Sequence, residues 1–159
     1  MTSDGDDFLL QADRFEETGD LGSAFNSLLV GAEANFSGCQ LNLANFYAQG
    51  KGTPKSYDRS AFWYKRAYRN GLPDAALNLA IDHRNQGNTR SAVSWFRKAI
   101  AMGDGEACLQ LAQLYLARKR NLPEAGELLR QAVSSDYISE ESREESQAIL
   151  EHRNERATP

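Results

Sequence analysis

Hydrophobic residues along this chain recur with the 3.6-residue period of an amphipathic helix, and no alternating pattern typical of a strand competes with it. The period is clearest in three segments that resemble one another: CQLNLANFY from Cys39, AALNLAIDH from Ala75 and ACLQLAQLY from Ala107. Their leucines and alanines fall at matching positions. This predicts an internal repeat, each copy of which opens with a helix.

A second helical segment follows each of these three. In it a small residue stands three positions after a bulky pair, and the copies are Trp63-Tyr64 with Ala67, Trp95-Phe96 with Ala99, and Leu128-Leu129 with Ala132. Each unit is thus a first helix, a turn and a second helix. Alanines at the helix contacts let the two helices approach closely. Because one helical pair cannot bury its apolar face alone, stacked neighbours are expected to supply the core.

The pattern predicts an all-α chain with helices over 6–18, 20–34, 38–49, 56–70, 73–86, 88–102, 105–119, 122–135 and 139–153. Side chains that can cap a free helix N-terminus precede the second helices, at Asp20, Ser56, Asn88 and Asn121. Residues that tolerate the left-handed conformation follow the second helices, at Asn35, Gly71 and Gly103.

The stretch LANFYAQGKGTPKSYDRSAFWYKRAYRNG, from Leu43 to Gly71, resembles a Sel1-like repeat, a relative of the tetratricopeptide repeat. The matching residues are Leu43, Tyr47, Gly50, Gly52, Trp63, Tyr64, Ala67 and Gly71. The departures are Ala44, Thr53, Ser56 and Ser60, which keep small size, branching or capping ability. The resemblance implies an α-solenoid used for protein–protein contact.

We therefore expect an α-α superhelix, or solenoid, of about four helix–turn–helix repeats in a single Sel1-like domain. The expected ranges are 6–36, 37–72, 73–104 and 105–137 for the repeats, 138–154 for a C-terminal capping helix, and 1–159 for the domain.

Charge is distributed unevenly: residues 1–20 carry a net charge of −6, residues 136–159 carry −4 and the middle carries +6, which sums to −4. Terminal repeats of solenoids need polar outer faces, so the acidic ends are expected to be solubilising caps. In the last helix, Ile149 and Leu150 would cover the final repeat. The same distribution would also suit an acidic partner docked on the basic middle.

The glycine-rich stretch GKGTPKS, which begins at Gly50, has neither the spacing nor the preceding strand of a phosphate-binding loop, and it is predicted to be a turn. His83 occupies the position of Tyr47 and Tyr115, which favours a packed ring over a general base or ligand. Two cysteines a whole repeat apart are expected to be free buried thiols. No catalytic constellation stands out, so we expect no enzyme, no cofactor and no metal.

The face of the first helices opposite their leucines is the predicted partner-binding surface, and by family analogy it lines the concave groove. Its residues are Asn42, Asn45, Phe46, Gln49, Asn78, Ile81, Asp82, Asn85, Gln110, Gln113 and Leu114. Carboxamides both donate and accept hydrogen bonds, so a ladder of them could pair with a peptide backbone. Phe46, Ile81 and Leu114 would be apolar anchors. The alternative is a polar wall that binds nothing.

Aligned basic residues on the second helices, Lys65, Arg97 and Arg130, are expected to form a solvated outer face, with an anion-binding stripe as the alternative. The net charge of −4 does not favour a nucleic-acid partner, and no apolar run approaches the length of a membrane span. With an acidic N-terminus that lacks the pattern of a secretory signal, the chain is expected to be cytoplasmic.

The function predicted from these features is that of a non-catalytic adaptor or regulator, a monomer, which holds another protein or peptide in its groove. One alternative is an immunity protein that neutralises a bacterial toxin by direct binding. A second alternative comes from the resemblance, because some Sel1-like proteins have been linked to β-lactam binding or hydrolysis.

Overall fold

The computed structural model describes residues 4–155, and within that range it contains nine helices and no strand. The helices are α1 (Asp4–Glu17), α2 (Leu21–Glu33), α3 (Ser37–Gln49), α4 (Tyr57–Arg69), α5 (Pro73–Asn85), α6 (Thr89–Ala101), α7 (Gly105–Ala117), α8 (Leu122–Ser134) and α9 (Glu140–Glu155). Every predicted helix is present, with ends that agree to within two residues.

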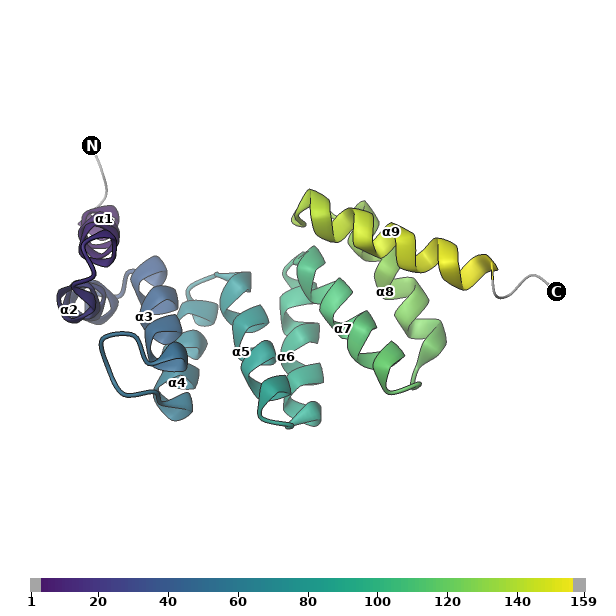
Figure 1. Ribbon diagram of the computed structural model, residues 1–159, viewed down its shortest axis with the longest axis horizontal. Helices are drawn as coiled ribbons and strands as arrows, with labels where there is room; N and C mark the ends of the chain where they lie inside the picture. Colours follow the sequence, from purple (N-terminus) through teal and green to yellow (C-terminus); the bar gives the residue numbers. More distant parts are fainter. Residues whose placement is uncertain (1–3, 156–159) are drawn as a thin grey trace.

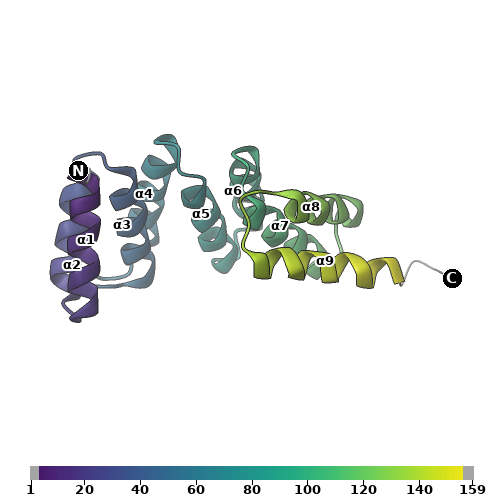
Figure 2. The same ribbon diagram turned by 90° about the horizontal axis from the view of Figure 1, so that it is seen from above.

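Successive helices pair and the pairs stack, which confirms the all-α solenoid (Figure 1). The pairs α1–α2, α3–α4, α5–α6 and α7–α8 pack most extensively, and α9 covers the end of the stack against α8 and α7. Seen from above, α1 and α9 lie at opposite ends of an elongated molecule (Figure 2). The packing follows directly from the repeated apolar stripe, which only a neighbouring pair can bury.

Capping explains where the second helices start. The side-chain oxygens of Asp20, Ser56 and Asn88 accept hydrogen bonds from the backbone N–H three residues later, as predicted. The prediction for Asn121 is wrong, because its backbone is left-handed (φ 47°) and its side chain makes no capping bond. The chain reverses there through Lys119, which also has positive φ, and α8 starts without that cap.

Two clusters of buried side chains form the interior. The N-terminal core runs from Ala12 on α1 to Leu79 on α5, and the C-terminal core runs from Ala76 on α5 to Ala132 on α8. They meet at the T-shaped pair Tyr68–Trp95, whose ring centroids are 5.5 Å apart. The predicted contact alanines are fully buried, namely Ala44, Ala67, Ala80, Ala99, Ala112 and Ala132.

The first helices of the first three pairs contact one another along one side of the stack. Helices α1 and α3 pack directly against each other, and so do α3 and α5. The second helices meet chiefly through large side chains such as the Tyr68–Trp95 pair. We call the side of the stack along which α1, α3 and α5 contact one another the inner side.

Helix α9 is the predicted cap. Ile149 and Leu150 pack on the C-terminal core. The guanidinium of Arg143 donates to the backbone carbonyls of Val133 (2.6 Å) and Ser135 (3.0 Å), which fastens α9 to the end of α8. The acidic side chains between Glu140 and Glu151 are exposed.

The stretch GKGTPKS follows α3 as a turn. Gly50 closes α3 with φ 76°, and Gly52 has φ 60°. A Cβ on Gly52 would overlap the backbone carbonyl of Leu21, so the loop rests on the start of α2. Lys51 forms an ion pair with Glu16 of α1 (2.8 Å). This loop therefore ties the second repeat to the first and carries Lys55 toward α5.

Candidate partner-binding site

Six of the predicted residues line one hollow of about 260 Å³ on the inner side, between α3, α4 and α5. They are Asn45, Gln49, Asn78, Ile81, Asp82 and Asn85. Four further residues complete the lining, namely Ala48, Lys55, Tyr57 and Tyr64. We call these ten residues the α3–α5 pocket.

A hydrogen-bond network forms the base of the α3–α5 pocket. The side-chain oxygen of Asn45 accepts from the Tyr64 hydroxyl (2.6 Å) and from the Asn78 amide (3.2 Å). Three helices are thereby joined at one oxygen atom. Within the described chain, the NH₂ group of Asn45 and the carbonyl oxygen of Asn78 make no hydrogen bond. The two N–H donors of Asn45 and the carbonyl acceptor of Asn78 therefore remain beside the hollow.

Asp82 supplies a carboxylate to the same hollow. Its Oδ2 accepts a hydrogen bond from the hydroxyl of Ser60, which is fully buried (3.3 Å). Burial raises the pKa of Asp82, while the Ser60 hydrogen bond and the charge of Lys55 act in the opposite direction. The ammonium of Lys55 lies 4.7 Å from the ring centre of Tyr57, and its charge also acts on the Asp82 carboxylate.

Gln49 and Asn85 are the exposed members of the predicted set, and their carboxamides have no hydrogen-bond partner within the described residues. Ile81 adds a half-buried apolar contact. The pocket can thus offer hydrogen-bond donors and acceptors, one carboxylate and a small apolar surface. Such a set suits a peptide backbone together with a polar or basic side chain.

Two of the three predicted anchors lie in the core. Phe46 is 3% exposed within the N-terminal core and Leu114 is 8% exposed within the C-terminal core. Neither side chain lines the α3–α5 pocket, because Phe46 packs in the N-terminal core and Leu114 lines a separate hollow between α6 and α7. Ile81 alone of the three lines the α3–α5 pocket.

The predicted carboxamide ladder is also interrupted. Gln110 accepts a hydrogen bond from Arg84 of α5 (2.5 Å), and Gln113 donates to Glu145 of α9 (2.8 Å). The cap thus covers the wall at the fourth repeat. Asn42 is half-buried on α3 outside the pocket lining. The open part of the ladder is confined to α3 and α5.

Sequence reasoning missed Lys55, Tyr57 and Tyr64 as members of the site. Tyr64 belongs to the Trp-Tyr pair, which was assigned to packing alone, and its ring is indeed 2% exposed. The sequence did indicate a polar contact at Tyr64. The equivalent positions carry Phe96 and Leu129, so only Tyr64 has a hydroxyl that needs a hydrogen-bond partner.

The other residues considered for chemistry are accounted for by packing. His83 is half-buried, and burial and the charge of Lys65 lower its pKa against the effect of Asp82. Cys39 and Cys108 are free and buried as predicted, and burial raises the pKa of the Cys108 thiol to about 11. Among residues 4–155 no cluster of His, Cys, Asp and Glu side chains could hold a metal ion.

Of the three basic residues predicted to form a stripe on the second helices, Lys65 is exposed and the other two form ion pairs. Arg97 pairs with Glu124 (2.9 Å) and Arg130 pairs with Glu127 (2.8 Å). Lys98 lies over Trp95, with 3.6 Å between the ammonium and the ring centre. In the part of the chain that the structure describes, no helix has the length and apolar character needed to cross a membrane.

Comparison with family models identifies the repeats. A Sel1-repeat model matches residues 37–72 and 105–137, and a tetratricopeptide-repeat model matches residues 74–103. No curated protein matches the sequence. The match confirms the Sel1-like repeat that was expected from the stretch between Leu43 and Gly71.

Solved structures share the fold. A Sel1 repeat protein from Oxalobacter formigenes is similar over 92% of this chain, at 21% identity and a TM-score of 0.74. The protein c5321, a protective antigen present in uropathogenic Escherichia coli strains, is similar over 81% of the chain, at 26% identity and a TM-score of 0.71. MamA is similar over 91% of this chain, at 16% identity and a TM-score of 0.65, and the match covers 81% of the MamA chain. The present chain spans 62% and 30% of the length of the first two.

Proposed function

Since this chain belongs to the Sel1-like repeat proteins of the tetratricopeptide type, we propose that it is an adaptor or regulator without catalytic activity, which holds an extended segment of a partner protein in the α3–α5 pocket. Stacked helical repeats generally act as non-catalytic interaction scaffolds, and their inner walls are the usual binding surfaces.

The observation that carries the proposal is the arrangement around Asn45. Tyr64 and Asn78 fix the orientation of its carboxamide, and the NH₂ of Asn45 and the oxygen of Asn78 are left beside a hollow. Groups whose rotamers are fixed before binding lose little entropy when they bind. The pair is therefore suited to accept and donate one hydrogen bond each to an extended backbone.

Selectivity would come from the charged residues of the same pocket. The Asp82 carboxylate favours a basic or hydrogen-donating side chain of the partner at the inner end, where Ser60 holds the acid. Gln49 and Asn85, at the exposed end, would extend the contact to the next peptide unit. Ile81 provides the apolar surface between these ends.

The test is retention of a partner by the immobilised chain from a lysate of the source cell, compared between the wild type and Gln49→Ala/Asn85→Ala. Both side chains are exposed, so the melting temperature should stay within the small range typical of surface changes. A matched control is Asn26→Ala/Glu33→Ala on α2, where both residues are also exposed.

We expect the pocket variant to lose the partner and the control to keep it. Equal retention by all three proteins would overturn the proposal. Neutralisation of a bacterial toxin by direct binding would use the same surface. Co-expression of a captured toxin with the wild type or the pocket variant, scored by growth, tests that narrower function.

A further inference from the structure

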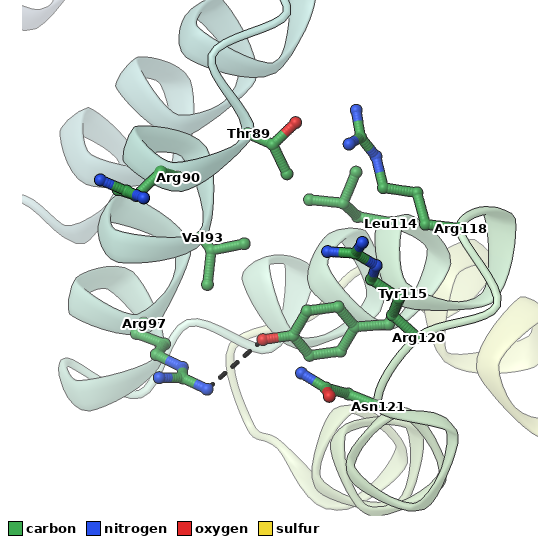
Figure 3. A pocket seen from close by; sticks show the side chains of 9 residues that line it. All are labelled: Thr89, Arg90, Val93, Arg97, Leu114, Tyr115, Arg118, Arg120 and Asn121. Atoms are coloured by element: carbon green, nitrogen blue, oxygen red, sulfur yellow. Dashed lines mark hydrogen bonds between the residues drawn. The ribbon is translucent and has the colours of Figure 1, made fainter.

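A second and larger hollow, of about 440 Å³, lies between α6, the end of α7 and the loop that leads to α8 (Figure 3). Its lining consists of Thr89, Arg90, Val93, Arg97, Leu114, Tyr115, Arg118, Arg120 and Asn121. None of these residues lines the α3–α5 pocket. We call this hollow the arginine pocket.

The floor of the arginine pocket is apolar. Val93 and Leu114 face each other across it, and the ring of Tyr115 lies beside Leu114 (Figure 3). Leu114 and Tyr115 are 8% and 6% exposed, so their positions are held by the C-terminal core. The floor is thus pre-formed, and an apolar side chain of a ligand could cover it without displacing protein atoms.

Four arginines surround that floor, and the positive charge is mostly uncompensated. Arg97 has partners, because it pairs with Glu124 and donates a long hydrogen bond to the Tyr115 hydroxyl (3.4 Å). Within the described chain, the guanidinium groups of Arg90, Arg118 and Arg120 make no hydrogen bond or ion pair. All three are exposed, and in Figure 3 the guanidinium of Arg90 is turned outward.

Guanidinium groups that share a small hollow repel one another, and an anion placed among them removes that repulsion. Arginine binds carboxylates through two parallel N–H donors, which gives strong and oriented contacts. The apolar floor is best covered by an apolar group, which a simple inorganic ion does not have. The complementary ligand therefore carries carboxylates on either side of an apolar group.

We propose that the arginine pocket binds an acidic segment of a partner protein, with an aliphatic side chain seated on Val93 and Leu114 and flanking carboxylates held by Arg118 and Arg120. The site lies on different helices from the α3–α5 pocket, so it goes beyond the function proposed above. A partner could occupy one site without the other, and the two proposals fail independently.

The experiment uses a fluorescein-labelled, N-acetylated peptide with one leucine between two pairs of glutamates, and binding to the full chain is followed by fluorescence anisotropy. The dissociation constant should rise at least about tenfold for Arg118→Gln/Arg120→Gln. A matched control is Arg14→Gln/Arg69→Gln, which removes the same charge at exposed positions on α1 and α4. Val93→Thr keeps the shape of the floor but replaces a methyl group by a hydroxyl, and should weaken binding about threefold.

Further measurements separate the possible occupants. In the wild type, the methyl NMR signals of Val93 and Leu114 should shift on titration with the peptide, and the glutamine version of the peptide should not bind. Equal weakening in the control variant, or displacement of the peptide by millimolar inorganic phosphate, would overturn the proposal. So would light scattering that shows self-association abolished by Arg118→Gln/Arg120→Gln, since the acidic α9 of a second copy would then be the occupant.

Discussion

The contact between the second and third repeats and the contact between the third and fourth are built from equivalent positions, yet their chemistry differs. We call the first the polar seam and the second the apolar seam. The equivalent pairs, polar seam first, are Asn45 and Ile81, Ser60 and Ala92, Tyr64 and Phe96, and Asp82 and Leu114. Each of these four hydrogen-bonding side chains of the polar seam has a hydrocarbon side chain as its counterpart, whereas Asn78 has another carboxamide, Gln110.

The two seams show that this repeat can be joined in two self-consistent ways. In the polar seam, Tyr64 and Asp82 find partners in Asn45 and Ser60, and a hollow remains at the surface. In the apolar seam, Phe96 is fully buried, and the hollow left at the surface is the arginine pocket, which has an apolar floor. The four differences belong together, because one polar group moved alone into the apolar seam would be left without a partner.

Truncation of Phe96, which fills the apolar seam, should have the largest effect on stability. Phe96→Ala leaves a cavity in the C-terminal core and should lower the free energy of unfolding by about 3–5 kcal/mol. The control is Phe62→Ala, because Phe62 is 55% exposed and should change stability by well under half as much. Urea denaturation followed by circular dichroism measures both. Similar losses for the two variants would contradict the burial of Phe96.

The loops that flank the two seams differ as well, and glycine substitutions compare them. Gly87 has φ 77° with open space around it, so Gly87→Ala should cost about 1 kcal/mol of stability for the backbone conformation. Gly52→Ala adds a clash with the carbonyl of Leu21, and the cost should reach about 2–4 kcal/mol. Equal costs in thermal denaturation would show that the loop does not rest on α2.

A reciprocal exchange tests whether each seam is matched to its own partners. Tyr64→Phe removes the hydrogen bond to Asn45 and should cost about 1 kcal/mol. Phe96→Tyr places a hydroxyl where Ile81 stands in the position of Asn45, and should cost about 1–3 kcal/mol. If Phe96→Tyr were neutral in chemical denaturation, the seams would not be chemically distinct.

The pH dependence of stability should show a smaller difference. Because burial raises the pKa of Asp82 above its ordinary value of 3.8, the folded state holds this proton more tightly than the unfolded state. Its contribution to stability is full below that ordinary value and is lost as the pH rises through the folded-state pKa.

Asp82→Asn lacks this loss. Its free energy of unfolding, relative to that of the wild type, should therefore increase as the pH rises from below 3.8 through the folded-state pKa of Asp82. Other carboxylates are present in both proteins, so the difference isolates Asp82. A difference that stays constant across this range would show that the environment of Asp82 is as polar as water.

The amino-acid sequence alone determined the repeat, the helices and most of the caps. Helix periodicity and recurring alanines are local signals, because they depend on residues only one or two helical turns apart in the sequence. The short polar caps at Asp20, Ser56 and Asn88 are local too, and they formed as predicted. Asn121 differed because its backbone is left-handed, and a residue type alone does not specify that conformation.

Only the tertiary structure decided which predicted wall residues are available to a partner. Phe46 shares a helix face with the exposed Gln49, yet the adjoining helices bury it. Gln113 became engaged because α9 returns over α7, a contact between residues 32 positions apart in sequence. Periodicity gives the direction of a side chain around its own helix, whereas the angle and distance of the next helix determine what it meets. For that reason the stack could be predicted from the sequence, and the α3–α5 pocket and the arginine pocket could not.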